Sequence, residues 1–95
     1  MLSNEDILRQ QGELNRALTL SLTISQQNLL HAMSAGKKNL SSQKVMKEYR
    51  LKSSTEVSRA RKALIANDIL DDFGKQYSFE DPIYEYWLKN VFFKD

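Results

Sequence analysis

Polar and apolar residues repeat at helical spacing over residues 4–18. Asn4 is a suitable N-cap, acids occupy the first turn, and apolar residues follow three or four positions apart. The apolar stripe is thin and Gly12 weakens its middle, so we expect this helix to lean on another element. From Thr19 to Ile24 polar and apolar residues alternate, which predicts an extended segment.

Three further helices are predicted between Ser25 and residue 67. Ser25 and Ser42 are suitable caps for the first two, and Gly36 is placed to end the first. After a tight turn at residues 51–53, Ser53 and Glu56 have the spacing of a capping box that opens the third. The apolar residues of these helices are Leu29, Leu30, Met33, Val45, Met46, Tyr49, Val57, Ala60, Leu64 and Ile65. Two helices joined by so tight a turn predict a helix-turn-helix.

A hairpin and a last helix are predicted in the remainder of the chain. Ile69-Leu70 and Tyr77–Phe79 flank Gly74-Lys75, which favours a hairpin with a short tip. Leu40, within the polar connector 37–41, is expected to form a short strand that pairs with this wing. Asp81 can cap a final helix with Pro82 at its first position. The apolar side chains expected to bury this helix are Ile83, Tyr86, Trp87, Val91 and Phe92.

This order of elements predicts a winged helix: a mainly α fold with a small β-hairpin wing, plus an extra N-terminal and a C-terminal helix. We expect residues 1–22 to form a linker helix with an extended segment, and residues 23–95 to form the winged-helix domain. With 95 residues, the chain has little material for a deep catalytic cavity.

The charge is unevenly distributed along the chain. The net charge is only +2, yet residues 37–67 hold nine Lys or Arg and two acids, whereas residues 68–95 hold three Lys and seven acids. A basic middle segment indicates either a surface for a polyanion or a solvated face that pairs with the acidic end. The chain has no cysteine, no signal segment and no apolar run that could span a membrane, so a cytoplasmic location without membrane partners is expected.

One stretch resembles a known family. Ser53–Val57, Ala63–Leu70 and Tyr77–Leu88 together resemble the C-terminal winged-helix domain of prokaryotic, archaeal-type AAA-like or STAND P-loop ATPases, and Leu22–Leu30 is similar to the opening helix of that domain. The residues that carry the family motif, with an expected structural role, are Tyr77, Asp81, Pro82, Trp87 and Leu88.

The resemblance implies that the chain is part of a longer ATPase whose nucleotide-binding domain lies upstream and would be its partner. Gly36-Lys37 is not a P-loop, because His31 stands where the first glycine is needed and Lys38 where Ser or Thr is needed. No cofactor is expected on this chain.

Candidate nucleic-acid contacts gather on the helix 54–67. Hydroxyls at its start suit a phosphate, and basic side chains farther along could reach base edges. The candidates are Ser53, Ser54, Thr55, Ser58, Arg59 and Lys62, with Arg61 on the same helix and Lys44, Lys47, Arg50 and Lys52 as backbone contacts. Glu56 at the groove entrance, and Asp71 and Asp72 on a wing with only Lys75 at its tip, argue against DNA.

Other side chains with chemical potential have simpler interpretations. His31 is the only histidine, so no metal site is expected, and Asp81 and Glu85 are explained as a cap and a solvated helix residue without catalysis. Tyr86, Trp87 and Phe92 could stack on bases, but core packing, with Trp87 under the wing, is the favoured interpretation. Phe93 is a candidate contact with the parent protein.

Two functions remain open on these grounds. The favoured one is a non-catalytic regulatory or interaction module that docks on the ATPase core or a protein partner. The alternative is a module that binds double-stranded DNA through the helix 54–67.

Overall fold

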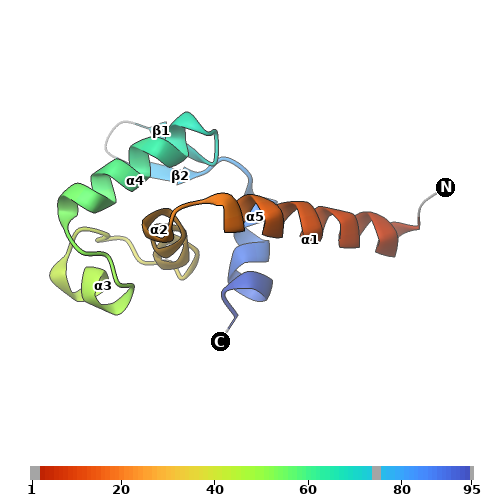
Figure 1. Cartoon of the computed structure of the whole chain (residues 1–95), viewed down its shortest axis with the longest axis horizontal. Helices are drawn as coiled ribbons and strands as arrows, with labels where there is room; N and C mark the ends of the chain where they lie inside the picture. Colours follow the sequence, from red (N-terminus) through yellow and green to blue (C-terminus); the bar gives the residue numbers. More distant parts are fainter. Residues whose placement is uncertain (1–2, 74–75, 95) are drawn as a thin grey trace.

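The computed structural model describes residues 3–73 and 76–94 of the chain. The elements run in the order α1 (Asn4–Ser21), α2 (Ile24–Ser34), α3 (Gln43–Glu48), α4 (Ser54–Ala66), β1 (Leu70–Phe73), β2 (Gln76–Phe79), α5 (Pro82–Trp87) and the π-helical turn η1 (Leu88–Phe92). In Figure 1, α2, α3, α4 and the hairpin form the body, while the N-terminal part of α1 extends away from it. The helix, helix, helix, hairpin order confirms the predicted winged-helix fold.

The helices α2, α3 and α4 all end in a left-handed residue that turns the chain sharply. The residues are Gly36, Arg50 and Asp68, with φ of 82°, 59° and 59°. In each case the next N–H donates to a carbonyl of the last turn, such as Leu51 to Met46 at 2.8 Å. This Schellman arrangement satisfies carbonyls that a helix end leaves without partners. The turn at Arg50 also joins α3 to α4, which together form the predicted helix-turn-helix.

The hydrophobic core lies between α2, α4, β1 and η1. Its largest fully buried apolar side chains, at most 1 % exposed, are Leu29, Leu30, Leu64, Leu70 and Leu88. On α4 the buried residues Val57, Ala60 and Leu64 recur every three or four positions, so one stripe of this helix packs on α2 and the rest faces outward. The inward face predicted for α4 is therefore confirmed for these three residues.

The predicted hairpin is present, but the predicted third strand is not. β1 and β2 pair antiparallel, with Leu70 opposite Phe79 and Asp71 opposite Ser78. Among the described residues the sheet has two strands, and the segment around Leu40 is coil and turn. Leu40 instead buries its side chain in the core, which explains the lone apolar residue without a strand. The predicted tip, Gly74-Lys75, lies outside the described residues.

The expectation of an extended segment from Thr19 to Ile24 is wrong. The helix α1 continues to Ser21, and only Leu22 and Thr23 are extended before α2 begins at Ile24. Within this helix the Thr19 hydroxyl donates to the Asn15 carbonyl at 2.7 Å and meets the Tyr84 hydroxyl at 2.6 Å. Thr23, rather than Ser25, caps α2, in a capping box with Gln26.

The C-terminal segment is buried through different residues from those predicted. Tyr84 and Leu88 enter the core, whereas Ile83, Tyr86 and Val91 are exposed. Tyr84 and Leu88 are four positions apart, as on one face of an α-helix, so the buried stripe begins one residue after the predicted Ile83. The wider π-helical η1 changes the period only for the residues that follow, such as Val91. The N-terminal signals of α5 are confirmed: Asp81 accepts from Ile83 N at 2.9 Å and Pro82 begins the helix.

The sequence led us to expect Trp87 under the wing, but the residue packs against α1 instead. Its indole is half-buried against α1, where Nε1 is 3.6 Å from the position of a Cβ on Gly12. The ring stacks on Tyr84 at 6.1 Å between centroids, and Phe92 lies 5.5 Å away. The last helices therefore hold α1 against the body, which is the support that its thin apolar stripe requires.

Candidate nucleic-acid interface

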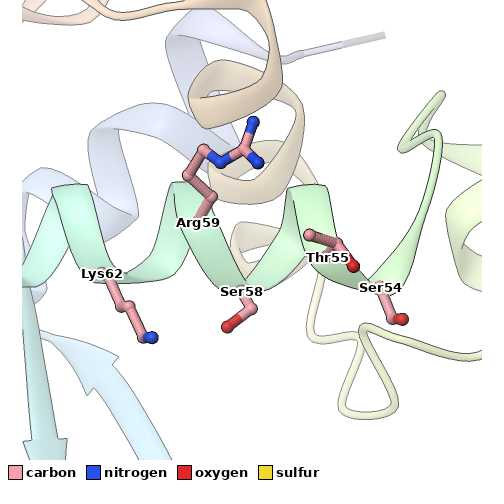
Figure 2. A pocket seen from close by; sticks show the side chains of 5 residues that line it. All are labelled: Ser54, Thr55, Ser58, Arg59 and Lys62. Carbon is pink, nitrogen blue, oxygen red and sulfur yellow. The ribbon is translucent and has the colours of Figure 1, made fainter.

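The outward face of α4 brings together five of the predicted contact residues. Ser54, Thr55, Ser58, Arg59 and Lys62 line one shallow, open hollow on this helix. Figure 2 shows Ser54, Ser58 and Lys62 pointing the same way along one edge of α4, whereas the Arg59 guanidinium extends toward the opposite edge. This face carries two cations and three hydroxyls and no acid.

The local sequence explains why this face of α4 is not covered by the rest of the chain. Ser53 caps α4 by accepting from the Glu56 N–H at 3.1 Å, so the helix begins at Ser54. Because Val57, Ala60 and Leu64 hold the buried stripe, residues 54, 58 and 62 lie on the other side of the helix. The first turn of α4 is thus presented with its hydroxyls outward.

Glu56 does not belong to this exposed face, although the sequence placed it at the groove entrance. One carboxylate oxygen accepts from the Ser25 hydroxyl, and the other accepts from the Lys52 N–H at 3.2 Å. The predicted capping box is thus only half-formed, because the Glu56 carboxylate binds Lys52 and Ser25 rather than the Ser53 N–H. Its negative charge is turned toward the start of α2, away from the hollow lined by Arg59 and Lys62.

A second groove runs beside the first, between the starts of α2 and α4. Predicted residues Lys52, Ser53, Thr55 and Arg59 line it, together with Thr23, Ser25, Gln26, Glu56, Ala60 and Ala63. Sequence reasoning missed the contributions of α2, because the contact between Ser25 and Glu56 joins residues 31 apart. The one sequence feature that could have indicated this groove is the group of polar residues at the start of α2, Thr23, Ser25 and Gln26.

The remaining predicted cations lie around this surface rather than in it. Lys44 and Lys47 are exposed on α3, and neither lines the two hollows. Arg61 is half-buried on α4. On the hairpin, Asp72 is exposed and Asp71 is half-buried, so the folded wing still carries the two acidic residues that the sequence placed there. Lys75 lies outside the described residues.

The other sequence candidates pack within the chain. His31 stacks on Phe93 at 4.3 Å between centroids and meets Tyr49 edge-on at 4.9 Å. Phe93 is therefore partly engaged within the chain, and its expected contact with a parent protein stays a prediction. Residues 3–73 and 76–94 contain no group of three or more His, Asp or Glu placed to hold a metal. The backbone of Tyr77 pairs with Asp72, and its side chain is outside the described part of the structure.

A protein-family model covers most of the chain. A family model described as "Probable winged helix domain" matches residues 14–90. No curated protein and no solved structure matches the chain significantly. Nothing in these comparisons links the chain to P-loop ATPases, so that resemblance stays a prediction. Among the described helices, none is both long and apolar enough to cross a membrane.

Proposed function

Since the chain belongs to the family described as probable winged helix domain, we propose that it is a DNA-binding module that places α4 against duplex DNA. The observation that supports this choice is the composition of the α4 face, where Ser54, Ser58 and Lys62 share an edge and Glu56 is bonded elsewhere. An α-helix fits the major groove, and hydroxyl, lysine and arginine side chains are common phosphate contacts.

The charge around α4 gives the proposed orientation of the complex. Lys52, Lys44 and Lys47 lie on the N-terminal side of α4, whereas Asp71 and Asp72 lie on the hairpin that follows its C-terminal end. Phosphates are attracted to the first region and repelled by the second. The DNA backbone therefore approaches the helix-turn-helix side of the domain, and the wing makes the smaller contribution.

A second candidate function is docking on a protein, including the ATPase core that the sequence resemblance implies. The observation that favours docking is a separate surface, the exposed Ile7, Leu14 and Leu18 of α1. This surface does not overlap the α4 face. Neither candidate assigns a catalytic role to the chain.

The DNA proposal is tested by fluorescence anisotropy with a mixed-sequence duplex at low salt. We expect log affinity to fall linearly with log salt concentration, with a slope of about 0.9 for each phosphate neutralised. The double variant Arg59→Ala/Lys62→Ala should bind more weakly and lower the slope by roughly 1–2. A matched control is Lys89→Ala/Lys94→Ala, which removes the same charge from the distant C-terminal segment.

Two results would overturn the proposal. One is the absence of binding at about 100 μM protein, a concentration at which non-specific DNA binding is normally seen. The other is an equal loss of affinity in the two double variants, which would indicate that only net charge matters. Circular dichroism of both variants checks that they fold.

A further inference from the structure

Glu56 and Arg59 are neighbours on the surface of α4. Side chains three positions apart on a helix lie close together, and opposite charges at this spacing attract one another. Both residues also line the groove between the starts of α2 and α4. Helical spacing alone therefore favours an ion pair, which would occupy the Arg59 guanidinium.

The structure does not contain this ion pair. Among the described residues, no carboxylate is paired with Arg59, whose side chain is exposed. The Glu56 carboxylate instead accepts two hydrogen bonds, one from the Ser25 hydroxyl and one from the Lys52 N–H. These two donors take up the acid, so the neighbouring guanidinium keeps its charge available to a partner outside the chain.

Ser25 is the donor that comes from a different helix. It lies half-buried in the first turn of α2, and its hydroxyl reaches the Glu56 carboxylate across 31 residues of sequence. Hydrogen bonds to an ionised carboxylate are stronger than those between neutral groups, so two of them fix its position. Without the Ser25 hydroxyl, Glu56 keeps only the bond from the Lys52 N–H at 3.2 Å, and its second oxygen can turn toward Arg59.

We propose that Ser25 is a positioning residue for the DNA interface: by holding Glu56, it keeps the Arg59 guanidinium available to a DNA phosphate. This role rests on the proposed DNA-binding function. Ser25 acts through Glu56 and not by touching the DNA. An Arg59 already neutralised by Glu56 would displace no counterion from a phosphate, so the interface would lose one electrostatic contact. A residue of α2, outside the helix-turn-helix, thus sets the charge that α4 presents.

Salt titration of DNA binding by Ser25→Ala tests this role. The variant should bind roughly fivefold more weakly at low salt, the factor that one contact between opposite charges near 4 Å contributes in water. Its slope of log affinity against log salt should fall by up to about 0.9, the value for one phosphate. The double variant Ser25→Ala/Glu56→Gln should bind as tightly as Glu56→Gln alone, because a neutral amide cannot neutralise Arg59.

The matched control is Ser34→Ala, which removes a hydroxyl from the other end of α2. The Ser34 hydroxyl donates to the His31 carbonyl at 3.0 Å, far along the helix from Glu56, so the slope should not change. Equal binding by Ser25→Ala and wild type would overturn the role of Ser25 and leave the DNA proposal in place. So would an equal loss in Ser34→Ala, or a slope that Glu56→Gln does not restore.

NMR of the Arg59 side chain tests the internal contact without DNA. The Nε–H signal of Arg59 should shift in Ser25→Ala, as the guanidinium pairs with Glu56, and should return in Ser25→Ala/Glu56→Gln. A signal that is the same in wild type and Ser25→Ala would overturn the inference whether or not the chain binds DNA. A shifted signal in a chain that binds no DNA would confirm the hold of Ser25 on Glu56 and overturn the proposed function instead.

Discussion

Thr19 and Tyr84, 65 residues apart in the chain, join their hydroxyl groups at 2.6 Å and so connect α1 to α5. Thr19 donates its only hydroxyl proton to the Asn15 carbonyl at 2.7 Å, so the Tyr84 hydroxyl must be the donor to Thr19. Both side chains are buried. α1 also contacts the C-terminal segment through the packing of Trp87 on Gly12, so this hydrogen bond is the polar part of that interface.

Removing the two partners of this bond should have unequal effects. Tyr84→Phe removes a donor and leaves Thr19 bonded to Asn15, so we expect a loss of about 1 kcal/mol in the free energy of unfolding. Thr19→Val leaves a buried phenol without a partner and should cost roughly 1–3 kcal/mol. Urea unfolding of both single variants and the double variant measures the coupling. A larger loss for Tyr84→Phe than for Thr19→Val would contradict the assigned direction of donation.

Tyr84 should also make stability depend on alkaline pH. Burial raises the pKa of Tyr84 above its ordinary value of 10.0. The unfolded chain therefore releases this proton at lower pH than the folded chain. The contribution of Tyr84 is complete below the unfolded pKa and is lost as pH rises above it toward the folded pKa.

The measurement is urea unfolding of wild type and Tyr84→Phe between neutral pH and pH about 11. The stability advantage of the wild type should shrink above pH about 10, because only the wild type has a buried phenol to ionise. An advantage that stays constant over this range would show that Tyr84 ionises equally in both states.

Two glycines should respond to alanine with opposite signs. A Cβ at Gly12 would make an ordinary contact with Trp87 at 3.6 Å. Gly12→Ala should therefore stabilise the protein by about 0.5–1 kcal/mol through helix propensity. Gly36 has open space but a φ of 82°, so Gly36→Ala should destabilise by about 1 kcal/mol or more. Thermal unfolding of the two variants compares them, and the same sign for both would be inconsistent with this structure.

Arg50 is the strained residue of the helix-turn-helix. Its φ of 59° costs a non-glycine residue roughly 1–2 kcal/mol, which exceeds the entropic cost of glycine in the unfolded chain. Arg50→Gly should therefore raise the free energy of unfolding by up to about 1 kcal/mol. Asp68→Gly at the same φ should gain less, because aspartate tolerates this conformation better. A loss of stability in Arg50→Gly alone would point to a contact of the arginine side chain that outweighs the strain.

The sequence predicted most elements whose signals are local, although Ser3 rather than Asn4 caps α1 and Thr23 rather than Ser25 caps α2. The caps Ser42, Ser53 and Asp81 and the left-handed stop at Gly36 act through neighbouring residues, and the structure has each of them. Predictions that depended on distant contacts were less successful. The alternation of polar and apolar residues after Thr19 is consistent with a strand. The hydrogen bond of Thr19 with Tyr84 joins residues 65 apart, so the sequence near Thr19 gives no sign of it.

The candidate site shows the same division. Spacing along one helix was sufficient to group Ser54, Ser58 and Lys62, because residues four apart share a face. The position of the Glu56 carboxylate was not predictable, since it depends on how α2 packs beside α4 and brings Ser25 within reach. The inward face of the C-terminal segment was predicted wrongly because it depends on which aromatic side chain of α5 reaches α1, and Tyr84 does so through its hydrogen bond with Thr19.

The two-stranded sheet has a consequence for solubility. With no strand from the segment around Leu40, the outer edge of β1 has no neighbouring strand among the described residues. Open edges invite strands from other molecules and so begin aggregation, and charges on the edge strand oppose this. Asp71 and Asp72 place two negative charges within the four residues of β1. The acidic wing, unfavourable for nucleic acid, thereby opposes intermolecular strand addition along β1.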